Sequence, residues 1–222
     1  MKPDLMRKNG VVFAGLVLVV AAVFALGCKP PKYIKYVSEA KDASFQVPWG
    51  WNIYFDDQGS KFYQYNFVGP FDPEFFLGLP SLSVRWHSFG RSRRLRDGSY
   101  ERFRSADNYI GKTLRKVYGP EYQVPGGIKR VSVAGWEGKS FVVESVAKVP
   151  EDYHFGVSID PDTGSQGIIR KHSYVVLPMD NGFYVMVYPA TRGGHMKHLR
   201  AFNHLVNTFK VRTDGPGGAR IR

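Results

Sequence analysis

The chain has 222 residues, a formal net charge of +12 and a single cysteine. That length suits one medium-sized domain or two small ones, and a content of 43% hydrophobic and 15% aromatic residues excludes an intrinsically disordered protein. One cysteine excludes an intramolecular disulfide framework and any zinc site built from several thiolates. The excess of basic residues favours anionic partners and says nothing about the fold.

The amino terminus has the layout of an export signal. A short segment with Lys2, Arg7 and Lys8 against Asp4 precedes an uncharged apolar run at residues 11–26. A membrane-spanning helix needs about 20 apolar residues, so this run is short for one and suits a secretory signal peptide. No twin arginine precedes the run, so the general secretory route is expected.

The segment Ala25-Leu26-Gly27-Cys28 resembles the lipobox of bacterial lipoproteins. In that family the cysteine thiol receives a diacylglyceryl group, and cleavage makes the cysteine the first residue of the mature protein. The resemblance implies a palmitate-type lipid on Cys28 and removal of residues 1–27, which leaves 195 residues. Lys29 stands where an inner-membrane retention signal has aspartate, so family analogy favours the outer membrane. The alternative is an uncleaved signal anchor with an incidental cysteine.

Composition divides the rest of the chain into a tether, one domain and a tail. Residues 29–41 are polar and contain two prolines, which is typical of a linker. We therefore predict the lipidated cysteine and its tether at 28–43 and a single folded domain at 44–212. Residues 213–222 contain Gly and Pro and are predicted to form a flexible tail.

Apolar residues that alternate with polar ones predict the strands of the domain. The expected strands are residues 44–48, 51–55, 62–68, 82–89, 128–133, 139–149, 167–176 and 183–188, with a Pro- and Gly-rich loop at 69–80. Asn181-Gly182 predicts a tight hairpin between the last two strands. Pro48, Gly50 and the two neighbouring tryptophans are expected to cover a sheet edge.

Two segments change to helical spacing. The first has Phe103, Ala106, Ile110, Leu114 and Val117 on one face, with Ser99 as the expected N-cap and Gly119 at its end. The second has its apolar stripe at Leu199, Phe202, Leu205, Val206 and Phe209. One mostly antiparallel sheet covered by two helices buries every apolar face, so an α+β fold is predicted.

Three segments resemble the PsbP-like superfamily, which includes the extrinsic PsbP subunit of photosystem II and the Mog family of Ran-binding proteins. The matching segments are Phe45-Gln46-Val47-Pro48-Trp49-Gly50-Trp51, Val131-Ser132-Val133-Ala134-Gly135-Trp136-Glu137-Gly138, and Phe183-Tyr184-Val185-Met186-Val187-Tyr188-Pro189-Ala190 with the helix end Leu205-Val206-Asn207-Thr208-Phe209. The resemblance implies an α/β/α sandwich. Its members are mostly binding or assembly proteins, and no particular function carries over.

The search for catalytic and metal sites finds no complete constellation. The sequence has no nucleophile elbow, phosphate-binding loop or zinc-protease motif. Asp160 begins a segment like a calcium loop, but Lys171 stands where the bidentate glutamate should be. His195, His198 and His204 cluster near the last helix, and His195 and His198 could share one face. Zinc would need a third ligand beside these two and supporting partners, and none is indicated. We predict no catalytic residue, no metal and no cofactor.

The most distinctive feature is a basic segment at residues 91–116, which has nine basic residues against three acidic ones. We predict that it binds an anionic surface, with contacts from Arg91, Arg93, Arg94, Arg96, Arg104, Lys112, Arg115 and Lys116. The alternative is a solvated helix face preceded by a basic loop.

The leading functional hypothesis is a non-enzymatic, lipid-anchored binding or assembly module of the bacterial cell envelope. Its predicted partners are the membrane, through the N-terminal lipid, and an acidic protein or anionic envelope polymer; export argues against nucleic acid. A second hypothesis is a small-molecule carrier whose pocket is lined by the loop 69–80 or the aromatic sheet face. A third is a cell-wall hydrolase, in which His87, His154 or His172 would bind a carboxylate in a cleft.

Overall fold

A computed structural model describes residues 31–40, 42–148, 155–159 and 166–212. The chain divides into two compact units, Met1–Lys32 and Tyr33–Arg222. All buried residues of the two hydrophobic cores belong to the second unit. That unit therefore has the complete apolar interior that independent folding needs. The predicted export signal, Cys28, His154, the Asp160 segment and the predicted tail fall outside the described residues.

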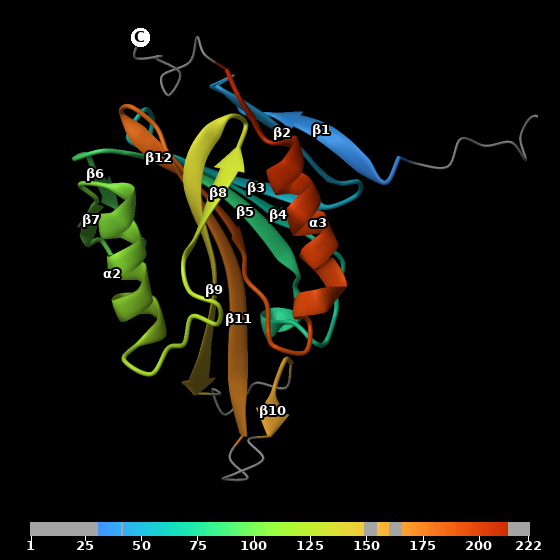
Figure 1. Cartoon of the computed structure of the whole chain (residues 1–222). Coiled ribbons are helices and arrows are strands. Elements are labelled where there is room, and N and C mark those ends of the chain that lie inside the picture. Colours follow the sequence, from blue (N-terminus) through green and yellow to red (C-terminus); the bar gives the residue numbers. More distant parts are fainter. Residues whose placement is uncertain (1–30, 41, 149–154, 160–165, 213–222) are drawn as a thin grey trace, which may run out of the picture. The chain divides into compact units, whose positions relative to one another are not determined.

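A twisted antiparallel sheet forms the centre of this unit (Figure 1). Its strands lie in the order β3 (Asn52–Asp57), β4 (Phe62–Val68), β5 (Ser81–Ser88), β12 (Gly182–Tyr188), β11 (Gln166–Pro178), β9 (Trp136–Lys148) and β8 (Lys129–Val133), and β10 (Ser158–Ile159) also pairs with β11. All its strand pairs are antiparallel. The turn at Asn181-Gly182 joins β11 to β12 as predicted.

Separate layers cover the two faces of the sheet, and Figure 1 shows the two helices on opposite sides. One face packs against α3 (His195–Thr208) and a small sheet of β1 (Tyr33–Val37), β2 (Ala43–Pro48) and β13 (Lys210–Val211). The other face packs against α2 (Ala106–Tyr118), whose Ile110 and Leu114 meet Phe183 in the second core. The predicted α+β fold, an α/β/α sandwich, is confirmed.

The ordered domain begins earlier than the predicted boundary at residue 44. Tyr33–Val37 forms β1, which pairs with β2 over five residues. The ring of Tyr36 packs against Phe45 and Phe67 at 5.5 and 5.2 Å between centroids. The predicted tether at 28–43 therefore includes a strand of the domain, because these aromatic side chains are drawn into the core despite their polar neighbours.

The start of the first helix also differs from the prediction. Residues 92–102 form a hairpin of β6 (Ser92–Arg94) and β7 (Tyr100–Arg102). The N-cap of α2 is therefore Ser105, whose hydroxyl accepts a hydrogen bond from the Asn108 backbone N–H at 3.0 Å, and not Ser99. The predicted end is confirmed, since Gly119 follows α2 with a φ of 76° that suits glycine.

The tryptophans after Pro48 divide between core and solvent. Trp51 packs against the first core and meets the ring of His198 at 5.4 Å. Trp49 is 53% exposed, so only one of the two rings joins the core.

The two layers on the α2 face differ in length. The 13 residues of α2 span about 20 Å, whereas the 13-residue strands β9 and β11 span about 43 Å. One end of this sheet face therefore extends beyond the helix. The loop 69–80, with its short helix η1 (Phe76–Gly78), folds over that end and is joined to the body by hydrogen bonds such as Gly156 N–H to the Pro73 carbonyl.

Candidate functional site

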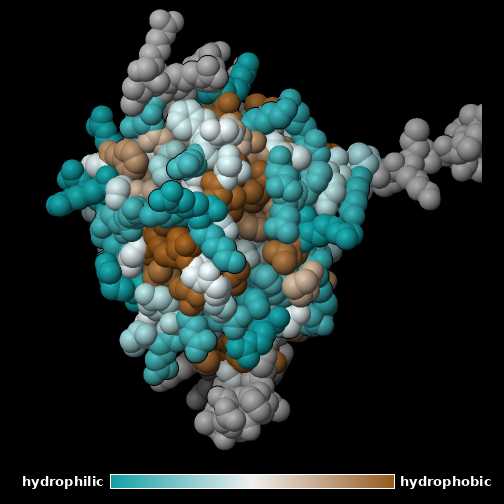
Figure 2. Space-filling model, in the orientation of Figure 1, coloured by the Kyte–Doolittle hydropathy of each residue, from teal (hydrophilic) through white to brown (hydrophobic). Residues whose placement is uncertain are grey.

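The predicted basic segment folds into two adjacent elements, the β6–β7 hairpin and α2. Its exposed cations are Arg91, Arg94, Arg96, Arg102, Arg104, Arg115 and Lys116, and Lys112 is half-buried. On the face shown in Figure 2, hydrophilic side chains cover this region, and hydrophobic groups show between the two helices. The eight residues Arg91, Arg94, Arg96, Arg102, Arg104, Lys112, Arg115 and Lys116 are called the basic surface below.

Arg93 does not join this surface, although the sequence predicted that it would. Its guanidinium binds the Glu101 carboxylate at 2.6 Å and lies 4.2 Å from the centroid of the Phe62 ring. Strand alternation turns it toward the sheet, since Arg93 pairs with Glu101 across the hairpin. Among the described residues, no member of the basic surface has a carboxylate partner within salt-bridge distance.

Three cations converge on one hollow at the N-terminal end of α2. Arg102, Arg104, Asn108 and Lys112 line a space of about 320 Å³, called the basic hollow below. The Lys112 ammonium donates to the Arg102 carbonyl at 2.9 Å and lies 5.5 Å from the Phe103 ring, which holds its charge at the rim. The positive end of the helix dipole adds to the attraction for an anion.

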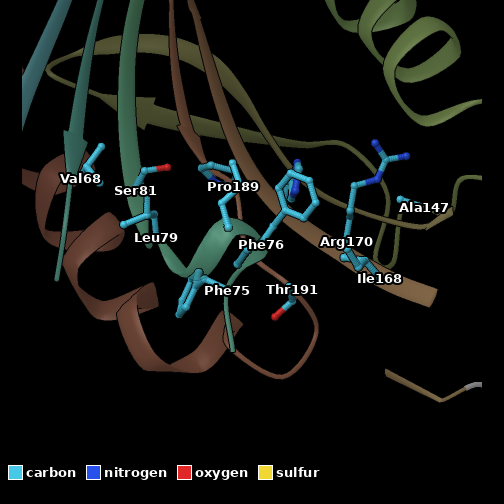
Figure 3. A pocket seen from close by; sticks show the side chains of 13 residues that line it. Val68, Phe75, Phe76, Leu79, Ser81, Ala147, Ile168, Arg170, Pro189 and Thr191 are labelled. Carbon is cyan, nitrogen blue, oxygen red and sulfur yellow. The ribbon is translucent and has the colours of Figure 1, made fainter. Parts of the chain in front are cut away.

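A second concave site lies where the sheet extends beyond α2 (Figure 3). It is a pocket of about 460 Å³ between the loop 69–80, the strand β11 and the segment that follows β12. Its lining is mainly apolar, with Phe75, Phe76, Leu79, Ile168 and Pro189 among the contributing side chains. The carrier hypothesis placed a pocket at this loop, and the structure has one there.

The polar lining of this pocket includes two basic side chains of β11. The Arg170 guanidinium donates to the Ser145 hydroxyl and to the Val117 carbonyl, both at 3.1 Å. His172 Nδ1 lies 2.7 Å from the Tyr118 hydroxyl. Burial, helped by the nearby positive charge of Arg170, lowers the pKa of His172 to about 3. His172 is therefore neutral at pH 7.

The histidines do not gather into a metal or catalytic centre among the described residues. His195 Nε2 bonds to Ser173 at 2.9 Å, and His204 Nε2 bonds to Gln46 at 2.8 Å. His87 is buried among aromatic rings and, like His172, has no carboxylate partner within the described part of the chain. No group of three or more potential metal ligands occurs there either.

None of the helices in the described ranges has the length and apolar character needed to span a membrane.

Sequence reasoning missed the contributions of Arg102 and Arg170 to these sites. The signal for Arg102 was the period-two spacing with Tyr100 in a short strand, which the helical interpretation of this segment hid. Arg170 shares one face of β11 with Ile168 and His172, but no local pattern shows that the loop 69–80 folds over that face.

No family model matches the sequence, and no curated protein matches it. Among solved structures, it is similar to the cyanobacterial PsbP of Synechocystis sp. PCC 6803, with 12% identity and a TM-score of 0.48 over 84% of this chain and 96% of that one. It is also similar to the Ran-binding protein Mog1p of Saccharomyces cerevisiae, with 10% identity and a TM-score of 0.47 over 81% of this chain and 95% of that one. A third similar structure is LpqN of Mycobacterium tuberculosis, a protein involved in cell envelope biogenesis, with 13% identity and a TM-score of 0.40 over 83% of this chain and 87% of that one. These likenesses concern the fold, and the first two come from the groups that the sequence resemblance named.

Proposed function

We propose that the protein is a non-enzymatic binding module of the bacterial cell envelope, anchored by a lipid on Cys28, that contacts an anionic membrane through its basic surface. The anchor rests on the Leu26-Gly27-Cys28 segment, which ends the long apolar run of the chain. The contact rests on the basic hollow, which is the observation that carries the proposal.

The basic hollow has the chemistry of a site for phosphate-bearing headgroups. Arg102, Arg104 and Lys112 contribute three positive charges around one space, and no described carboxylate neutralises them. Unpaired cations held this close repel one another, so their arrangement is stabilised when an anion enters. Arginine guanidinium groups also match phosphate oxygens in a bidentate geometry.

The surroundings of the hollow suit a membrane interface. Each Lys or Arg near an anionic membrane contributes about 1 kcal/mol of binding, and the basic surface has five further exposed cations on the same hairpin and helix and the residue before them. Tyr100, on the strand beside Arg94, is 72% exposed, and tyrosine is enriched at membrane–water interfaces. A lipid-tethered domain meets such a surface at high effective concentration.

Vesicle binding tests the contact. A protein without residues 1–28 should bind vesicles that contain phosphatidylglycerol, and 0.5 M salt should abolish the binding because exposed charges are screened. Replacing Arg102, Arg104 and Lys112 together by Gln should weaken binding about 100-fold, from about 1 kcal/mol per charge. Sedimentation with vesicles measures the partition coefficient, and circular dichroism checks that the variant is folded.

A matched triple variant separates this effect from loss of net charge alone. Arg200, Lys210 and Arg212 are exposed and belong to the α3 side of the domain or the chain that follows it. Their replacement by Gln should change binding less than threefold. Equal losses in the two triples, or equal wild-type binding to neutral phosphatidylcholine vesicles, would contradict the membrane contact. Retention on lipoteichoic acid without vesicle binding would instead assign the surface to an envelope polymer.

The lipid anchor is tested at Cys28, which is the only acceptor thiol in the chain. In a bacterial host, the wild-type chain should incorporate radiolabelled palmitate and appear in the membrane fraction at its processed length. Cys28→Ser should incorporate no label and remain at precursor length, because the acylated cysteine directs cleavage. A processed Cys28→Ser form that stays in the membrane fraction would defeat the proposed anchor.

A further inference from the structure

The pocket beside the loop 69–80 has the size and lining of a small-molecule site. Its volume of about 460 Å³ lies in the range of ligand pockets, about 300–1,000 Å³. Main-chain and side-chain bonds hold its outer wall, including Asp72 N–H to the Gly78 carbonyl and the Lys197 ammonium to the Asp72 carboxylate at 3.1 Å. The wall is therefore preformed.

The outer wall keeps apolar side chains near water. Phe76, Leu77 and Leu79 line the pocket and are 46%, 55% and 46% exposed. Leu77 also adopts a left-handed backbone conformation, with φ 60° and ψ 10°, which costs a non-glycine residue about 1–2 kcal/mol. Strain of this kind is characteristic of binding and active sites. An apolar ligand body would cover these side chains.

The inner wall provides a positive charge with spare hydrogen-bond donors. Two N–H groups of Arg170 bind Ser145 and Val117, and an arginine has five such groups. These two hydrogen bonds hold the side chain in place. The other three N–H donors and the positive charge have no carboxylate partner among the described residues.

The residues around Arg170 favour an anion over a cation. No lining residue in the described part of the chain is acidic. The neighbouring His172 is neutral at pH 7 and bonds to Tyr118, so it offers no negative charge that would hold a cation. Glu144, on the neighbouring strand β9, does not supply a negative charge either, because its carboxylate is already bound by Lys171 and Arg192.

We propose that this pocket binds a fatty-acid-like anion of medium chain length, with its carboxylate at Arg170 and its apolar body between the loop 69–80 and the sheet. The proposal is independent of the membrane contact, because the pocket and the basic hollow share no lining residue. The protein would then carry a small amphipathic acid in addition to its contact with the membrane.

Equilibrium dialysis with radiolabelled decanoate tests the proposal on the protein without residues 1–28, below the micelle concentration. Saturable binding of one decanoate per chain is expected. Unlabelled decanol should compete more weakly, and decyltrimethylammonium should compete at least about tenfold more weakly than decanoate, since the three probes share the chain and differ in head charge. Absence of bound decanoate, or equal competition by the three probes, would overturn the proposal.

Variants assign the binding to the pocket. Arg170→Met should weaken decanoate binding at least about tenfold while changing decanol competition less than twofold, and Arg170→Lys should restore part of the loss. Leu79→Asp should weaken both probes, because it places a charge against the apolar body. Arg200→Met on α3 is the matched control and should bind like the wild type. If Arg170→Met and Arg200→Met have equal effects while both melt like the wild type, the head-group assignment is wrong.

Discussion

Lowering the pH from 7 to 4.5 should reduce the free energy of unfolding by at least about 2.5 kcal/mol, because His172 remains neutral in the folded domain and burial opposes protonation of His87. His87 is enclosed by four aromatic rings with centroids 5.0–5.4 Å from its own, those of Phe62, Phe103, Tyr109 and Phe183. Burial, with Arg93 and Arg85 nearby, holds the pKa of His87 well below its ordinary value. The second is His172, whose pKa burial lowers to about 3.

The direction follows from where the protons bind. In the unfolded chain both imidazoles take up a proton near pH 6.5, whereas in the folded domain protonation requires a lower pH, so acid favours the unfolded state. His172 contributes about 1.4 kcal/mol per pH unit below 6.5, or about 2.5 kcal/mol at pH 4.5, and His87 adds a loss of the same sign. His195 and His198, whose pKa values burial also lowers, act in the same direction. The carboxyl groups of Asp72 and Glu144 contribute mainly below pH 4.5. Hydrogen bonds outweigh the effect of desolvation and lower their pKa values from 3.8 and 4.5, with the Glu74 backbone N–H and Lys197 as donors to Asp72 and Lys171 and Arg192 as donors to Glu144.

Urea unfolding at pH 7, 6, 5.5, 5 and 4.5 measures this dependence. A loss of this size is a large part of the stability of a small domain, so the unfolding midpoint should fall steeply over this range. His87→Phe fits the aromatic surroundings and removes one titrating group, so its slope between pH 6 and 4.5 should be shallower than that of the wild type. A wild-type slope in His87→Phe would show that His87 does not cause the acid sensitivity.

Asp42→Ala should lower the free energy of unfolding by about 3 kcal/mol, because it leaves two buried hydroxyl groups without their acceptor. The Asp42 side chain is fully buried and accepts hydrogen bonds from the Ser38 hydroxyl at 2.5 Å and the Tyr63 hydroxyl at 2.7 Å. Tyr63 lies on β4 and also contacts the Tyr184 hydroxyl at 3.3 Å. Asp42 therefore joins the turn between β1 and β2 to the central sheet.

A double-mutant cycle separates this network from the general effect of a core substitution. In a Tyr63→Phe background, Asp42→Ala should cost at least about 1 kcal/mol less, since one of the stranded donors is already absent. Asp42→Asn keeps the shape and one acceptor oxygen and should cost less than Asp42→Ala. A loss below 1 kcal/mol for Asp42→Ala, or strict additivity with Tyr63→Phe, would contradict the assigned role.

Most of the central sheet could be predicted because apolar side chains alternate with polar ones along several of its strands. Leu82, Val84 and Trp86 alternate in sequence and all reach the first core. β1 was missed because Lys35 interrupts its apolar residues and two prolines precede it. The β6–β7 hairpin was missed because its strands have three residues each and are mainly arginine and polar residues, so no hydrophobic period marks them.

The two concave sites were predictable to different degrees. The basic hollow comes from residues within a span of eleven, Arg102 to Lys112, so the charge density of the sequence located it. The pocket combines residues from Val68 to Thr191, which only strand pairing brings together. Its position was suggested by the Pro- and Gly-rich loop, but its charged member, Arg170, depends on which face of β11 turns toward that loop.

The mismatch in length between α2 and the strands separates the wall of the pocket from the framework of the domain. The outer wall belongs to a surface loop, and loops tolerate insertion, deletion and substitution far better than packed strands. The exposed tip at Phe76 and Leu77 belongs to neither hydrophobic core. Evolution or design can therefore reshape the cavity by exchanging this exposed tip, while Phe75 and the rest of the interior that determines whether the protein folds are inherited unchanged.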